Sequence, residues 1–349
     1  MSSVLAPLLA VGIDDWWVQT VLRVVVGLVA LLLPAGTLVY LFLFKMMSFM
    51  QSRLGPMEAG PYGSLQLLAE VGKWLQKEDI FPAKADKYVF ALAPFVVLIS
   101  TFLLVLVLPG GPDAYFVNLD VGIYFALAVS SISVIGILMA GWASASKYAL
   151  MGGIRAAGQL IAYELPLVLA VLGVVIQAES LNMNTIVARQ AEWEIFGIGA
   201  FGMPFIVTQF LGFAIFMVAI QAELTQPPFD MPVAESEIVT GYLTEYSGIR
   251  FLLFFIGEFA TAGVFSAIGA VLFLGGWWVP FIDPTNNIFN VIGPLVLAGK
   301  MILLAFFIFW FRVTFPRFRE DQLQRLAWKV LVPLALLNIF VTGILKVVF

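Results

Sequence analysis

The sequence predicts an all-α, polytopic integral membrane protein with eight transmembrane helices and an amphipathic surface helix in the first cytoplasmic loop. The chain of 349 residues is 62% hydrophobic and only 11% charged, and its mean hydropathy is +1.01. Apolar runs of about 20 residues recur along it, which is the length an α-helix needs to cross the hydrocarbon core of a bilayer. These observations exclude an ordinary soluble domain.

Eight apolar segments have this length. The predicted spans lie near 18–44, 88–108, 121–142, 160–177, 204–221, 251–274, 292–311 and 328–349. Tryptophans fall near several segment ends, as an aromatic belt at the membrane interfaces predicts. Because no repeat, linker or low-complexity tract interrupts the spans, we expect one membrane domain over 1–349. The segment 1–13 has no basic start and no small-residue cleavage pattern, so we expect the first helix to be retained.

The connection between the first and second spans predicts the surface helix. Gly55-Pro56 and Gly60-Pro61 punctuate a turn-rich stretch. A helix follows near 64–77, with its apolar residues on one face and Glu70 and Lys73 elsewhere on the helical wheel. This spacing favours an amphipathic helix that lies parallel to the membrane surface.

Lysine and arginine are distributed unevenly among the connections. The first connection, Lys45–Lys87, and the last are rich in them, and the third carries Lys147 and Arg155, whereas 109–120 and 275–291 hold none. By the positive-inside rule, the basic connections lie in the cytoplasm. Both chain termini are then expected on the non-cytoplasmic side.

The fifth connection, 222–250, departs from this pattern because it is acidic. Its charged residues are Glu223, Asp230, Glu235, Glu237, Glu245 and Arg250. Acidic residues contribute little to membrane topology, so the cytoplasmic assignment stands. An acidic run between two apolar spans predicts a path of carboxylates from an aqueous face into the bilayer, and hence proton-coupled work.

Ionisable residues inside the predicted spans extend this path. Glu164 lies one turn into the fourth span and Glu258 about 12 Å along the sixth, and Glu223 lies at the end of the fifth. A carboxyl group in the membrane is costly, which favours a functional role over a structural hydrogen bond between helices. Lys300 lies in the middle of the seventh span, where a counter-ion and a participant in proton transfer are both open interpretations. We expect a proton path through these four residues.

The chain contains no cysteine and no histidine. This excludes thiolate-held iron–sulphur clusters, disulfides and thiol catalysis, and it removes histidine ligation of haem or zinc. Proton chemistry must therefore use Asp, Glu, Lys, Tyr or water, and no metal site is expected. The Gly55–Gly63 stretch lacks the lysine and hydroxyl residue of a phosphate-binding loop, so no nucleotide site is expected. No nucleic-acid partner is expected either.

Several motifs follow one another in a fixed order between Lys45 and Thr342. They include Gly60-Pro61-Tyr62-Gly63, Ala140-Gly141-Trp142-Ala143-Ser144, Tyr163-Glu164, Pro228-Phe229-Asp230, Glu235-Ser236-Glu237, Gly257-Glu258 and Pro316-Arg317-Phe318-Arg319. In these motifs the chain resembles the NuoH-type membrane subunit of respiratory complex I, the NADH:quinone oxidoreductase. The resemblance covers nearly the whole chain.

The resemblance implies a subunit that joins the membrane arm of a proton-pumping complex to its hydrophilic arm and is not catalytic alone. Quinone, as substrate, would enter a chamber between the surface helix, the first and sixth spans and partner subunits. No cofactor would be bound by this chain alone, since the iron–sulphur clusters and flavin belong to partner subunits. Membrane lipid is a further expected partner, and the expected location is an energy-coupling membrane such as the bacterial plasma membrane.

Residue roles follow from the same resemblance. Glu164, Glu223 and Glu258 match a funnel of carboxylates that couples quinone reduction to proton pumping in neighbouring subunits. The resemblance assigns six further residues to the quinone chamber and its acidic loop: Glu70, Asp230, Glu235, Glu237, Glu245 and Arg53. Glu70 stands at a chamber-lining position that is usually Asp.

The chain also departs from the family pattern around the chamber. Met57-Glu58, Leu43-Phe44, Thr225-Gln226 and Val233 stand where the family usually has Asn (often followed by Arg), Glu-Arg, Asn-Arg and Glu, respectively. These losses of charge or polarity leave two alternatives open. One is the homologous subunit of a membrane-bound hydrogenase or another donor-modified complex. The other is a free-standing proton-coupled transporter, which is disfavoured because the sequence shows no repeated halves.

Overall fold

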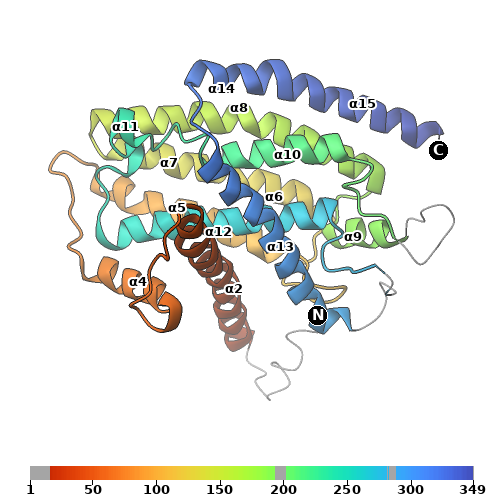
Figure 1. The fold of residues 1–349 in the computed structure, drawn as a ribbon, viewed down its shortest axis with the longest axis horizontal. Helices are drawn as coiled ribbons and strands as arrows, with labels where there is room; N and C mark the ends of the chain where they lie inside the picture. Colours follow the sequence, from red (N-terminus) through yellow and green to blue (C-terminus); the bar gives the residue numbers. More distant parts are fainter. Residues whose placement is uncertain (1–15, 193–201, 281, 283–287, 349) are drawn as a thin grey trace.

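The computed structural model describes residues 16–192, 202–280, 282 and 288–348, and these residues form helices, turns and loops without a strand (Figure 1). Seven of the helices in this described part are long and apolar enough to cross a membrane. The predicted class, an all-α polytopic membrane protein, is therefore confirmed. The expectation for segment 1–13 lies outside the described residues, as does residue 349 of the last predicted span.

The first and third predicted spans each contain more than one helical segment. The first consists of α2 (Trp16–Leu38), the π-helical η1 (Val39–Met46) and α3 (Met47–Met50). The second is the single helix α5 (Lys87–Val107), and the third is α6 (Gly122–Ser130) followed by α7 (Ile132–Ala143). In Figure 1, α2 is steeply tilted against α5 and α7, which run along the long axis of the molecule.

The later spans follow the same order as predicted. They are α8 (Lys147–Ala178), α12 (Gly248–Phe273), α13 (Phe289–Thr314) and the last span, which contains α14 (Glu320–Leu326), η4 (Ala327–Leu331) and α15 (Val332–Val348). Figure 1 shows α15 alongside α8, and α13 tilted across the bundle like α2. Tyr163 is fully buried, and its hydroxyl donates to the Leu323 carbonyl at 2.9 Å, which fastens α14 to α8.

The fifth predicted span, near 204–221, corresponds to the shorter helix α10 (Phe210–Glu223) of 14 residues. This falls short of the roughly 20 residues of a straight crossing. The helix begins late because the backbone N–H groups before it are paired elsewhere. Phe205 N donates to Gln190 Oε1 at 3.1 Å, and Ile206 N donates to the Phe273 carbonyl at 2.9 Å. The count of eight spans stays a prediction.

Helix α8 begins at Lys147 rather than near 160, because Gly152 and Gly153 serve close packing instead of a chain break. A Cβ atom on Gly152 would lie 2.6 Å from Gly241 Cα. Only glycine therefore lets α8 approach the loop after α11 (Glu235–Ile238) this closely. Arg155, assigned from the sequence to a connecting loop, lies inside this helix.

Two shorter α-helices and two 3-10 helices, η2 (Pro61–Gly63) and η3 (Gly241–Leu243), complete the described elements. Helix α4 (Gln66–Gln76) occupies the region predicted for the surface helix, and its orientation to a membrane stays a prediction. Helix α9 (Met183–Glu192) was not predicted. Its start is marked by Asn182, whose Oδ1 accepts from Asn184 N at 2.9 Å in the manner of an N-cap. Helices α4 and α11 lie at one end of the bundle and α9 at the other (Figure 1).

Candidate functional site

A cavity of about 310 Å³ lies between α2, α4 and α12. Apolar side chains of the three helices form most of its wall, and Glu70 supplies the one carboxylate among its lining residues. Trp74 lines it from α4, stacked on Phe251 at 4.5 Å between ring centroids, with Lys77 Nζ at 4.1 Å from the Trp74 ring. An apolar cavity of this size with few polar groups is typical of a small-molecule site.

The chamber residues predicted on the α4 side separate into two groups. Glu70 lines the cavity and accepts a hydrogen bond from Gln66 Nε2 at 3.4 Å. Arg53 lies in an exposed turn after α3, where its Nε donates to Gln51 Oε1 at 2.8 Å. Arg53 is not among the residues that line the cavity. The structure thus brings only Glu70 to the cavity from this side.

The inner wall of the cavity borders a charged cluster. Phe259 lines the cavity, and the guanidinium carbon of Arg312 lies 6.0 Å from its ring centroid. Arg312 Nη1 lies 3.6 Å from Glu258 Oε1. The buried amide of Gln226 joins these two groups, because it donates to Glu258 and accepts from Arg312. Glu258 and Arg312 therefore lie close to a residue of the cavity wall.

Asp230 belongs to the same cluster. Burial and the negative charge of Glu258 raise the pKa of Asp230 to about 6, although Arg312 and Arg317 act in the opposite direction. A carboxyl group with this pKa can take up and release protons close to neutral pH. Glu235, exposed on α11, adds a smaller contribution of the same sign.

Glu237 is placed differently from Asp230. It accepts a hydrogen bond from Arg155 Nη1 at 2.7 Å and a second from Arg317. The hydrogen bond from Arg155 is the largest cause that holds the pKa of Glu237 below its usual value. Glu237 therefore stays ionised and ties the acidic loop to α8 and to the segment after α13. Glu245 is half-buried shortly before α12.

Glu164 and Glu223 form a second carboxylate pair, between α8 and α10. They lie close enough for the charge of Glu164 to act on Glu223, and Ser131 Oγ donates a hydrogen bond to Glu164. The Oε2 atom of Glu223 is buried and has no hydrogen-bond partner among the described residues. An unpaired carboxylate oxygen inside a membrane protein is costly.

Lys300 is not brought to the carboxylates. Its Nζ donates to the carbonyls of Leu274 at 2.7 Å and Trp278 at 2.6 Å, just beyond the C-terminal end of α12. That end lies about 24 Å along the helix from Glu258. A lysine that donates to the last carbonyls of a helix acts as a C-terminal cap. The role of Lys300 in a proton path stays a prediction without a contact to support it.

The residues that contact Glu258 and Glu164, namely Arg312, Gln226 and Ser131, are not among the predicted site residues. In the sequence, Arg312 counts only toward topology, Gln226 only as a departure from a family pattern, and Ser131 carries no signal. Arg312 and Gln226 meet Glu258 from segments far apart in the sequence. The replacement of a charged residue by Gln226 is the one sequence signal that points to this cluster.

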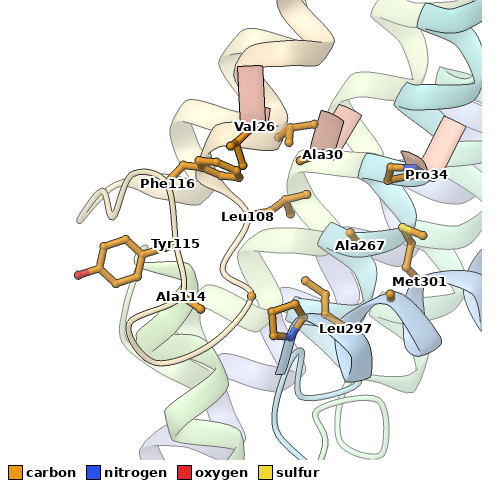
Figure 2. Close-up of a pocket in the computed structure, with 14 residues that line it drawn as sticks. Val26, Ala30, Pro34, Leu108, Ala114, Tyr115, Phe116, Ala267, Leu297 and Met301 are labelled. Carbon is orange, nitrogen blue, oxygen red and sulfur yellow. The ribbon is translucent and has the colours of Figure 1, made fainter. Parts of the chain in front are cut away.

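A second cavity, also of about 310 Å³, lies between α2, α12, α13 and the turn after α5 (Figure 2). Val26, Leu108 and Leu297 belong to its apolar lining, and the ring of Tyr115 points outward from the others in Figure 2. None of the described residues that line it is Asp, Glu, Lys or Arg. The two cavities have the same volume, but only the cavity beside α4 borders charged groups.

The fold and the site define a polytopic membrane protein in which a carboxylate cluster lies close to the wall of an apolar cavity. A family model described as NADH dehydrogenase matches residues 22–343. The H subunit of the NADH-quinone oxidoreductase of Bacillus mycoides (strain KBAB4) is 45% identical over 307 residues, 87% of this chain and 87% of the relative. The H subunit of the same enzyme from Anoxybacillus flavithermus (strain DSM 21510 / WK1) is 42% identical over 338 residues, 95% of this chain and 96% of the relative.

The chain therefore belongs to the family of NADH-quinone oxidoreductase H subunits. Of the three interpretations of the sequence, the relatives carry the name of the first, a subunit of NADH:quinone oxidoreductase, and not of a hydrogenase subunit or a transporter. Membership of a subunit family implies that other subunits of a membrane complex are its partners.

Proposed function

We propose that this chain forms one side of the quinone chamber of a proton-pumping NADH:quinone oxidoreductase and carries protons from that chamber into the membrane. The observation that supports the proposal is the cluster of Glu258, Gln226 and Arg312 next to Phe259, a residue of the cavity wall. The subunit names of the relatives agree with it.

In this proposal the quinone head group occupies the cavity between α2, α4 and α12. Reduction to quinol takes up two electrons, supplied by a partner subunit, and two protons. Negative charge on the reduced quinone acts across Phe259 on Arg312, Glu258 and Asp230 and favours proton uptake there. Because Asp230 titrates near pH 6, it is suited to bind a proton while the quinone is charged and to release it afterwards.

The second carboxylate pair then receives protons from this cluster. Glu223 at the end of α10 and Glu164 on α8 interact with each other, and Ser131 at the start of α7 donates to Glu164. From there protons continue to neighbouring subunits of the membrane arm. The whole chain would act as one membrane domain of eight spans, with α10 as the fifth. Both termini would lie on the non-cytoplasmic side of an energy-coupling membrane, the bacterial plasma membrane.

Glu258→Gln in the intact complex tests this function, because glutamine preserves the shape of the side chain but cannot titrate. We expect protons pumped per quinone reduced to fall at least about tenfold, measured in membrane vesicles with NADH as donor. Glu192→Gln is the matched control, since Glu192 is an exposed glutamate on α9 at the other end of the bundle. A wild-type ratio in Glu258→Gln would refute the relay role.

A further inference from the structure

Three buried acceptor oxygens in the described part of the chain have no hydrogen-bond donor. They are Gln159 Oε1, Gln221 Oε1 and Glu223 Oε2. Gln159 and Gln221 are each only 1% exposed. All three surround the C-terminal end of α10. Native proteins leave few buried acceptors unpaired, so this concentration at one helix end requires a physical account.

The orientation of both glutamine amides is fixed by their nitrogen atoms. Gln159 Nε2 donates to the carbonyls of Ala222 and Phe229, both at 2.7 Å. Gln221 Nε2 donates to the carbonyls of Pro227 at 2.7 Å and Ile308 at 3.2 Å. An amide nitrogen carries two hydrogens, and both are used here. Rotating either amide would set its oxygen against carbonyl oxygens, so rotation does not satisfy the orphan acceptors.

The two glutamines stand on opposite sides of the gap between the carboxylate groups. Gln221 bonds the carbonyl of Ile308 on α13, one turn before Arg312 in the Glu258 cluster. Gln159 lies on α8, as Glu164 does, and bonds the carbonyl next to Glu223. The end of α10 separates these two sides, and both amides reach it.

Hydrogen counting excludes a dry arrangement. A protonated Glu223 has one hydrogen to donate, which leaves at least one of the two amide oxygens unpaired. A water molecule donates two hydrogens and accepts others. Buried waters typically make about three hydrogen bonds to polar groups that are otherwise unsatisfied. Water is therefore the group whose two donors match these acceptors.

We propose that Gln159 and Gln221 are positioning residues that hold water between the Glu258 and Asp230 side and the Glu223 and Glu164 side, which completes the proton path of the proposed function. A carboxylic acid on one side loses its proton to the bound water. That water releases one of its own protons to the carboxylate on the other side, so the water is regenerated.

The chain contains a matched control for this role. Gln190 is fully buried and also donates through Nε2 to two backbone carbonyls, those of Val271 at 2.8 Å and Ile186 at 3.4 Å. Its oxygen, however, accepts from Phe205 N at 3.1 Å. Gln190 therefore shares the residue type, burial and donor use of Gln159 and Gln221 but has no orphan oxygen.

The first experiment is a structure of the intact complex at a resolution that shows ordered water. We expect water density within hydrogen-bond distance of Gln159 Oε1, Gln221 Oε1 and Glu223 Oε2, and none at Gln190 Oε1. The proposal would be overturned if protein groups donate to Gln159 Oε1 and Gln221 Oε1, or if no water density is found next to them. This result is independent of Glu258→Gln, so hydration and the proposed relay can fail separately.

The second experiment compares Gln159→Met, Gln221→Met and Gln190→Met in the complex. We expect proton-coupled turnover to fall about tenfold in the first two, with a larger solvent deuterium isotope effect, because a bound water in the path is lost. Gln190→Met should stay within about twofold of the wild type with an unchanged isotope effect. Equal losses and unchanged isotope effects in all three variants would show a purely structural role and refute the proposal. If a variant does not assemble, the water density decides.

Discussion

The two ends of the α8–α10 pair both bury polar side chains, but in opposite ways. At the end where α8 finishes and α10 begins, amides and hydroxyls of α8, α15 and the turn before α10 form a closed network. Gln177 Nε2 donates to Thr208 Oγ1 at 2.8 Å, Gln209 Nε2 to Thr342 Oγ1 at 2.8 Å, and Asn338 Nδ2 to Gln209 Oε1 at 2.9 Å. At the open end, where α10 finishes, carboxylates meet amide oxygens that no described residue pairs.

Under the proposed function, this difference separates polar groups that fasten helices from polar groups that exchange protons. A fully paired network of uncharged groups rigidifies a core, since any displacement leaves several members unsatisfied. Gly173 shows how tightly this one is packed, because a Cβ there would lie 2.8 Å from Asn338 Nδ2. Ionisable groups with free acceptors instead leave room for water and protons. Polarity inside the membrane is thus not by itself a sign of function.

Glu223→Gln gives the largest expected effect, at the open end. Glutamine keeps the volume of the side chain but cannot bind and release a proton. Pumping should therefore fall about 100-fold, in the range seen when general acid–base catalysis is lost. Thermal stability should change little, because Glu223 Oε2 has no described partner to lose. Proton uptake by vesicles and inactivation temperature measure the two quantities.

The matched control for this variant is Glu179→Gln. Glu179 lies at the C-terminal end of α8 and forms an exposed pair with Lys346 at 3.0 Å. Its substitution should leave pumping at the wild-type level. A similar loss in both variants would mean that the open end has no special role.

Gln209→Leu tests the closed end and should show the reverse pattern. It removes the acceptor of Asn338 Nδ2 and the donor to Thr342 Oγ1, so we expect a loss of about 2–3 kcal/mol in stability. Proton pumping per assembled complex should be unchanged. The midpoint of thermal inactivation measures the first effect, and the number of protons pumped per quinone reduced measures the second. A loss of pumping without a loss of stability would refute the proposed distinction between the two ends.

Asp230→Asn should change the pH profile of quinone reduction. The pKa of Asp230, raised to about 6 by burial and by Glu258, means that the carboxyl keeps its proton below that pH and ionises above it. Asparagine mimics the protonated form, so the variant should lose a transition near pH 6 that the wild type shows. Rates measured between about pH 5 and pH 8 test this. The same transition in both proteins would assign it to another group.

Glu237→Gln should have the smallest effect. The pKa of Glu237 is lowered by the hydrogen bond from Arg155, so the side chain stays ionised across the same pH range and adds no transition. The side chain is 43% exposed, and partly exposed ion pairs contribute only up to about 1 kcal/mol. We expect a stability loss within that limit, measured by thermal inactivation, and an unchanged pH profile. A shifted profile would place Glu237 among the titrating groups.

The fold class and the intramembrane carboxylates were predictable because long apolar runs, and single charged residues within them, can be read directly from the sequence. Glu164 and Glu258 stand out in that way. Their partners were not predictable, because Arg312, Gln226 and Ser131 come from segments far apart in the sequence. The predicted start of α8 is too late. Glycine is common in loops, but Gly152 lies inside α8 and allows close packing.

The region around α10 shows the same limit. Its apolar residues predict a full span, but tertiary hydrogen bonds to Phe205 and Ile206 delay the helix. The depth of Lys300 in a span suggests a place in the proton path, whereas its actual carbonyl partners depend on how α12 ends. Apolar runs and the distribution of charge predict the helices, whereas contacts between helices determine which polar residues come together.

The ring of Phe259 lines the cavity and also lies 6.0 Å from the guanidinium carbon of Arg312, which pairs with Glu258. In the proposed function no atom has to cross this ring, because the charge of a bound ligand acts on Arg312 and Glu258 at a distance. Binding of a ligand in the cavity and a change in protonation of the nearby carboxylates are then two separate effects. A neutral inhibitor of the right shape would block turnover without altering the protonation behind the ring, whereas an anionic ligand of the same shape would trap the proton carriers in their loaded state.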